Sequence, residues 1–290
     1  MIIVTGATGQ LGRQIVERLL TRVPADRVGV SVRDPQKAQA FADQGVRVRH
    51  GSFTDAASLA HAFEDASQVL IVSVDKMGEE AVRQHRAAID GAVAAGARRI
   101  LYTSHMGANA SSAFQPCRDH AATEEALRAS GVPFTSLRNG FYAASAVQFA
   151  GHGLESGAIT LPADGPVSWT AHADLAYAAA AILADEGLFD GPTPPLTAAQ
   201  ALTFDDIAAI ATEATGRTIT RTTAPDDQFR KQLVSNGVPA EAADRLLGIF
   251  AAGRAGEFAA VDPTLGALLG REPITLGTIL SEQLSSDDGR

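Results

Sequence analysis

The sequence predicts an α/β protein in which a doubly wound parallel sheet is followed by a smaller C-terminal α/β unit. In the first half of the chain, short runs rich in β-branched residues alternate with longer segments of helical period, and glycine closes several of those segments. After residue 138 the loops lengthen, and helical patterns follow one another without comparable strands between them. We therefore expect a Rossmann-like first domain over 1–140 and a smaller second domain, which binds the substrate, over 141–290.

The first domain should contain six strands and five connecting helices. The apolar runs predict strands at 2–5, 28–32, 46–49, 69–73, 100–104 and 134–138. Several runs are almost uninterrupted, as expected for strands covered on both faces. Helical spacing and closing glycines predict helices at 11–22, 35–44, 56–64, 79–95 and 119–129. Strands joined by such crossovers form a parallel sheet with helices on both sides.

The clearest element of the second domain is a helix between Thr203 and Gly216. Thr203 offers an N-cap hydroxyl and Asp206 an acidic side chain three residues later, ahead of the apolar run 207–211. Gly216 supplies a residue suited to the left-handed C-terminal cap. This helix is structural and carries no chemistry. The sequence leaves open whether the two domains are interwoven.

Composition excludes several classes of function. The 290 residues are 46% hydrophobic with a formal net charge of −9, and basic residues are scattered, so we expect a globular protein that does not bind nucleic acid. Its one cysteine, Cys117, permits neither an intramolecular disulfide nor a cysteine metal site. The seven histidines show no metal-ligand spacing, so no metal site is predicted.

The expected location is the cytoplasm, with no membrane partner. No basic segment precedes the first apolar strand, and the longest uncharged apolar run, 175–184, is too short to span a bilayer. The sequence does not define the oligomeric state and leaves a homodimer open.

A glycine-rich loop directly follows the first expected strand and runs into the first expected helix. This is the context of a dinucleotide fingerprint, in which glycines permit a sharp turn, close approach of a pyrophosphate and tight packing of helix on sheet. The loop residues assigned to the cofactor are Gly6, Ala7, Thr8, Gly9, Gln10, Leu11 and Gly12. The alternative is a glycine-rich turn that binds nothing.

The residue at the end of the second strand indicates which nucleotide is bound. NAD-specific folds carry an acidic residue there, about 20 positions after the loop, that bonds to the ribose 2′-hydroxyl. Here the position holds Arg33, followed by Lys37, and two positive charges suit a 2′-phosphate. NADPH is therefore the predicted cofactor. The alternative is that Arg33 is a solvated loop residue beside Asp34.

Several motifs together resemble the NmrA-like atypical short-chain dehydrogenases. They are the glycine loop, the segment 32–38, the strand end 102–104, the stretch 120–125 and the run 137–142. Within that family the chain is most similar to the bacterial NADPH:quinone reductases of type 2, with the triphenylmethane reductases close behind. The similarity extends from residue 1 to about residue 280.

The resemblance implies positions for the ligands. Ser73, Val74, Asp75, Thr103 and Ser104 would line the path to the nicotinamide, and His120 and Asn139 would act at the acceptor pocket between the two domains. Apart from the resemblance, the aromatic residues Phe141, Tyr142, Phe149 and Trp169 could supply a stacking surface for the substrate, although aromatic residues at the start of a second domain are more often core. One departure is Glu125, where the relatives have lysine, so any role of that lysine does not carry over.

The sequence lacks the Tyr-x-x-x-Lys pair with which short-chain dehydrogenases protonate an alkoxide. A quinone that accepts hydride becomes a stabilised phenolate, and a cationic dye becomes neutral, so both need little help from an acid. The expected function is NADPH-dependent reduction of a quinone-like or other aromatic acceptor. His120 would orient ligands, with Glu124 fixing its tautomer, or the two would form a surface pair without a role.

Two other functions stay open from the sequence alone. NmrA-like proteins include redox sensors that bind the dinucleotide without chemistry, and the missing pair does not distinguish a sensor from an enzyme. A reductase acting on an aromatic biosynthetic intermediate would differ only in its substrate.

Overall fold

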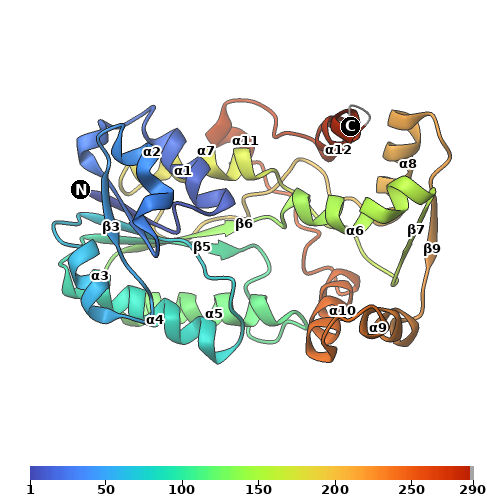
Figure 1. Ribbon diagram of the computed structural model, residues 1–290, viewed down its shortest axis with the longest axis horizontal. Coiled ribbons are helices and arrows are strands. Elements are labelled where there is room, and N and C mark those ends of the chain that lie inside the picture. Colours follow the sequence, from blue (N-terminus) through green and yellow to red (C-terminus); the bar gives the residue numbers. More distant parts are fainter. Residues whose placement is uncertain (288–290) are drawn as a thin grey trace. The chain divides into compact units, whose positions relative to one another are not determined.

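The computed structural model describes residues 1–287, and its largest element is one parallel sheet (Figure 1). Its seven strands lie in the order β3-β2-β1-β4-β5-β6-β8. The strands are β1 Ile2–Thr5, β2 Val28–Val32, β3 Arg47–His50, β4 Gln68–Ile71, β5 Arg99–His105, β6 Phe134–Asn139 and β8 Gly191–Pro192. This confirms the predicted fold class, and the six predicted strands occur within one or two residues of their expected bounds. β8 was not predicted.

Helices cover both faces of the sheet (Figure 1). On one face lie α1 Gln10–Leu19, α2 Gln39–Ala42 and α7 His172–Ala184, and on the other lie α3 Ala56–Ala62, α4 Glu79–Ala94 and α5 Gln115–Ala129. The predicted helix 35–44 is divided, because a 3₁₀ turn at Pro35–Ala38 precedes α2. The Asp34 carboxylate caps that turn by accepting a hydrogen bond from the Gln36 N–H, at 3.1 Å.

The chain forms two compact units and crosses between them several times. The sheet unit comprises Met1–Ala110, Pro116–Asn139 and His172–Leu196; the second comprises Ser111–Gln115, Gly140–Ala171 and Thr197–Arg290. Residue 140, the expected boundary, is one of these crossings. The segment His172–Leu196 then returns to the sheet unit, where α7 packs on α1.

The second unit contains a small parallel sheet of two strands, β7 Ala158–Leu161 and β9 Thr220–Thr223. Its helices are α6 Ala143–Ser156, α8 Phe204–Thr215, α9 Asp226–Ser235, α10 Ala240–Arg254, α11 Thr264–Leu269 and α12 Leu276–Asp287. The predicted capping box is present at α8: the Thr203 hydroxyl accepts from the Asp206 N–H, and the Asp206 carboxylate accepts from the Thr203 N–H. Gly216 ends that helix with a φ of 65°.

The core of the sheet unit fixes the position of the strand ends at which a ligand can bind. Apolar side chains from β4 and β5, such as Ile71 and Ile100, are fully buried against α3 and α4. The strand order reverses at β1, whose neighbours are β2 and β4. In open parallel sheets the carboxyl ends of the strands at such a reversal border the ligand crevice. Among the described residues, no helix has the length and apolar character needed to cross a membrane.

Candidate functional site

The loop after β1 has the geometry of a phosphate-binding turn. Gly6 has a φ of 61°, which glycine adopts without strain, and its carbonyl accepts a hydrogen bond from the Gly9 N–H at 3.0 Å. A Cβ on Gly12 would lie 2.3 Å from the Gly6 carbonyl oxygen, so only glycine allows α1 to pack this closely on the loop. No side chain caps the start of α1 at Gly9, and the first N–H groups of the helix are therefore available to an anion.

Even alanine should therefore be poorly tolerated at position 12. We expect Gly12→Ala to destabilise the protein by about 1–3 kcal/mol, as overpacking does, and to weaken NADPH binding at least tenfold (about 1.4 kcal/mol), because the loop must move. Urea unfolding and nucleotide titration measure the two effects. The matched control is Gly151→Ala in α6, where a Cβ meets nothing within 4 Å and should be neutral or slightly stabilising. Equal behaviour of the two variants would contradict this role for Gly12.

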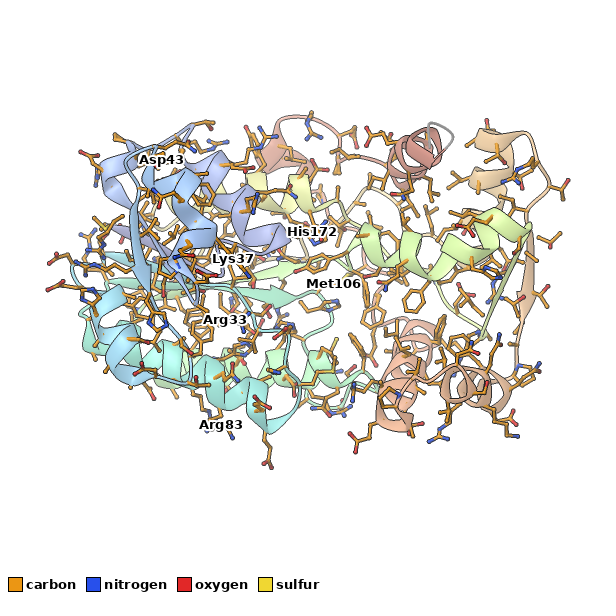
Figure 2. All side chains as sticks on the ribbon, viewed as in Figure 1. Arg33, Lys37, Asp43, Arg83, Met106 and His172 are labelled. Atoms are coloured by element: carbon orange, nitrogen blue, oxygen red, sulfur yellow. The ribbon has the colours of Figure 1, made fainter. Side chains whose placement is uncertain are left out.

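A cavity of about 560 Å³ opens at the carboxyl ends of β1 to β4, all within the sheet unit. Seven of the residues predicted for the cofactor line it, namely Gly6, Thr8, Gly9, Arg33, Ser73, Val74 and Asp75. The other seven, Ala7, Gln10, Leu11, Gly12, Lys37, Thr103 and Ser104, are not in its lining. Arg33 and Lys37 both follow β2 (Figure 2), but only Arg33 borders the cavity.

Residues at the ends of β2 and β3 also line the cavity, and the sequence analysis missed them. Ser31 is 2% exposed, and its Oγ has no hydrogen-bond partner among the described residues. A Cβ on Gly51, the residue after β3, would lie 2.1 Å from this Oγ, so glycine keeps the space beside the hydroxyl open. An unpaired buried hydroxyl fits a polar ligand group such as a ribose or phosphate oxygen. The one feature of the sequence that could have identified Ser31 is that it is the single serine in an otherwise apolar strand.

Thr103 and Ser104 form hydrogen bonds to residues around the site. The Thr103 Oγ1 accepts from the Ser73 N–H at 2.8 Å and so fixes the segment that follows β4. The Ser104 hydroxyl donates to the Glu124 carboxylate at 2.7 Å. Both residues are buried at the end of β5. They position the residues around them and do not line the cavity.

Glu124 does not fix the tautomer of His120, which corrects that sequence expectation. Its carboxylate forms a two-point ion pair with Arg138 on β6, through Nε at 3.1 Å and Nη2 at 2.7 Å. This bond raises the pKa of Arg138. Glu125 is an exposed residue paired with Arg128 one turn along α5.

His120 instead belongs to a cluster around Tyr102, in which Tyr102 and His85 are buried and His105 and His120 are half-buried. The Tyr102 Oη lies 2.7 Å from Nδ1 of His120 and 3.4 Å from Nδ1 of His85. A third imidazole, His105, stacks on His120 with ring centroids 6.0 Å apart. Burial lowers the pKa of His85 and of His105 to about 4, and burial together with these two neighbours lowers the pKa of His120 well below its usual value. The three rings are therefore neutral at physiological pH.

A second cavity of about 110 Å³ adjoins the histidine cluster. Its lining includes His85, Asp119 and His120, and it shares Ser73 to Lys76 with the large cavity. The segment after β4 thus borders both spaces. His120, a catalytic candidate of the sequence analysis, therefore lines a cavity that adjoins the one proposed for the cofactor.

Asn139 ends β6, where its carbonyl accepts from the Met106 N–H at 2.8 Å. Its side chain is buried, and Oδ1 has no partner within the described part of the chain. A buried amide oxygen without a partner is suited to accept a hydrogen bond from a bound ligand. Nothing in the geometry of the sheet unit gives Asn139 an acid or base role.

The predicted aromatic surface is largely core. Trp169 is 2% exposed, and its ring lies 5.3 Å from that of Phe141 and 5.8 Å from that of Phe204. Its indole N–H donates to the Leu202 carbonyl. Trp169 is therefore covered by its neighbours in the second unit and cannot stack on a substrate, which corrects that expectation. Phe141 is buried in the same cluster, and Tyr142 is partly exposed.

No group of residues suited to a metal ion occurs in the described part of the chain. Cys117 is buried, with its Sγ 3.5 Å from Nδ1 of His105.

Comparison with known proteins identifies the family. The model of the NmrA-like family matches residues 1–271 of the chain. The chain belongs to the NmrA-like family. Quinone oxidoreductase 2 of Escherichia coli (strain K12) is 36% identical to this NmrA-like chain over 282 residues, covering 97% of the chain and 98% of the relative.

Solved structures of NmrA-like proteins agree with this fold. An NADPH-dependent quinone oxidoreductase from Escherichia coli, in complex with NADPH, has a TM-score of 0.91 and 35% identity, covering 98% of this chain and all of the other. The Citrobacter triphenylmethane reductase in complex with NADP(H) has a TM-score of 0.88 and 33% identity, with 98% and 99% covered.

Proposed function

We propose that this NmrA-like protein is an NADPH-dependent oxidoreductase that reduces quinones or similar flat aromatic acceptors by hydride transfer. The observation that carries the proposal is the large cavity. Its lining combines residues of the glycine loop with Ser31 and Arg33 and with the segment Ser73 to Lys76. The similarity to an NADPH-bound quinone oxidoreductase over nearly the whole chain supports the same conclusion.

The residues of the cavity fit an NADPH molecule. The N–H groups at the start of α1 and the loop around Gly9 would hold the diphosphate, and Arg33 the 2′-phosphate. The unpaired Ser31 hydroxyl gives the adenosine end a polar partner. Ser73 and Val74, at the junction of the two cavities, would hold the nicotinamide end. When bound, the dihydronicotinamide supplies the hydride.

The choice of acceptor follows from the absence of the Tyr-x-x-x-Lys pair. None of the three lysines follows a tyrosine by four positions, so the lysine that strengthens a tyrosine as an acid in short-chain dehydrogenases is missing from its usual place. An alkoxide formed from an aliphatic ketone needs a strong, well-placed acid, whereas a hydroquinone anion is stabilised by its own ring. The protein then needs mainly to hold two flat rings in contact.

The test is oxidation of NADPH by the purified protein with four kinds of acceptor. We expect benzoquinones or naphthoquinones to be reduced, a cationic triphenylmethane dye to be reduced as well, and simple aliphatic ketones to fail, because the barrier for a ketone is higher by several kcal/mol. Rapid ketone reduction would contradict the proposal. Binding of NADPH without reduction of any acceptor would instead identify a nucleotide sensor.

A further inference from the structure

We propose that Tyr102 is the source of the second proton in quinone reduction and that His120 carries it to the acceptor. This inference rests on the proposed function and adds to it the residues that complete the reaction. The proposal is argued from the hydrogen-bond distances within the cluster around Tyr102.

The chain of bonds starts at a backbone N–H. The Val74 N–H donates to Nε2 of His85 at 3.1 Å, so in the neutral ring the proton of His85 lies on Nδ1. That Nδ1–H faces the Thr123 Oγ1 at 3.0 Å, and the Thr123 hydroxyl in turn donates to the Asp119 carbonyl at 2.8 Å. The Nδ1 of His85 therefore cannot accept the proton of Tyr102.

We assign the tyrosine proton to the bond with His120. The Tyr102 Oη is 2.7 Å from Nδ1 of His120, and in this short contact we take the hydroxyl as the donor and the imidazole as the acceptor. A neutral His120 that accepts at Nδ1 carries its own proton on Nε2. The ring nitrogens point in different directions, so this N–H is directed away from Tyr102. Within the described residues, Nε2 of His120 has no hydrogen-bond partner.

The position of His120 suits a relay. Its ring lines the smaller cavity, which shares Ser73 to Lys76 with the proposed cofactor cavity, so His120 lies next to the space proposed for the nicotinamide end. Because burial disfavours the charged imidazolium, His120 passes a proton from one nitrogen to the other and does not store one.

The reaction balances as follows. The quinone gains two electrons and one proton as a hydride from the dihydronicotinamide, which is oxidised. The oxygen of the resulting hydroquinone anion takes the proton from Nε2 of His120, while Nδ1 of His120 takes the proton of Tyr102. The tyrosinate is left beside the Nδ1–H of His85, at 3.4 Å. It regains a proton from water by the reverse path after the product leaves. Hydroquinone and tyrosine are both phenols, so their oxygens have similar intrinsic basicity.

The test compares Tyr102→Phe with the wild type on two acceptors. Tetramethylbenzoquinone forms a basic hydroquinone that needs the proton, whereas a cationic triphenylmethane dye becomes neutral on accepting hydride alone. We expect Tyr102→Phe to lower the quinone rate by about tenfold, to abolish a solvent deuterium isotope effect of about 2 that the wild type shows with the quinone, and to change the dye rate and the NADPH affinity by less than twofold.

Two further variants sharpen the result. His120→Gln can accept from Tyr102 but cannot pass a proton on, so it should show the same loss, and the double variant should be no slower than either single one. Tyr177→Phe on α7, whose ring contacts Arg22 and lines neither cavity, is the matched control and should behave like the wild type.

The outcomes separate this inference from the proposed function. If wild-type protein reduces no quinone, both fail. If it reduces the quinone and Tyr102→Phe keeps the full rate and isotope effect, only the inference fails. An equal loss with quinone and dye would give Tyr102 a structural role and would also overturn it.

Discussion

Replacing Arg33 by alanine should weaken NADPH binding by about 1.5–3 kcal/mol, the range of a charged hydrogen bond, and leave NADH binding almost unchanged. Only NADPH offers the guanidinium a 2′-phosphate. The wild type should therefore bind NADPH at least tenfold more tightly than NADH, a difference of about 1.4 kcal/mol. Calorimetric titration with both nucleotides measures these affinities.

The surroundings of Arg33 leave its charge available. Arg33 is exposed at the rim of the cavity, and the described residues give it no ion-pair or hydrogen-bond partner. Asp34, its neighbour, uses its carboxylate to cap the turn at Gln36. The matched control is Lys37→Ala, which removes one positive charge four residues later, outside the cavity lining. A parallel loss of affinity for both nucleotides in Arg33→Ala would indicate a folding defect and would remove Arg33 from the phosphate site.

Arg138→Met should destabilise the protein by about 3 kcal/mol. The substitution leaves the Glu124 carboxylate, whose side chain is 5% exposed, with Ser104 as its remaining bonded side chain. A buried charge that loses its partner costs more than the pair itself contributes. Urea unfolding measures the loss, and the double variant Glu124→Leu/Arg138→Met should recover most of it.

The same helix provides the control for this prediction. Arg128 pairs with Glu125, the residue next to Glu124, but both side chains are more than half exposed. Arg128→Met should therefore change the unfolding free energy by less than about 1 kcal/mol. A double variant as unstable as Arg138→Met, or an equal effect at Arg128, would show that the buried pair is not what stabilises this part of the fold.

The sequence predicted the sheet because its signals are local. Most of the first six strands are short segments rich in apolar residues, although β3 and β6 also contain polar ones. Each strand is joined to the next in the chain by a crossover. β8 gave no such signal because Gly191 and Pro192 have weak strand preference. The helix α7 is apolar on almost every side, so its period could not reveal that it returns to pack on α1.

The same reasoning explains which site residues were found. The glycine loop and Arg33 are defined by spacing along one strand–turn–helix segment, and spacing is visible in a sequence. The cluster of His85, Tyr102 and His120 comes from α4, β5 and α5, and only the crossovers of the sheet bring these residues together. The partner of Glu124 was misassigned for a related reason, since helical spacing suggested His120 while the fold supplied Arg138 from β6.

The two outer strands of the large sheet bear on how copies of the protein can associate. A strand at the border of a sheet exposes unpaired backbone groups on which another chain can build. Here one border is β8, which is two residues long and includes Pro192, a residue without an N–H. The other is β3, where the side chains of Arg47 and Arg49 donate hydrogen bonds to carbonyl groups at the end of α3 and in the turn beyond it. Short length and a proline on one side, and charge on the other, disfavour continuation of this sheet into a neighbouring molecule.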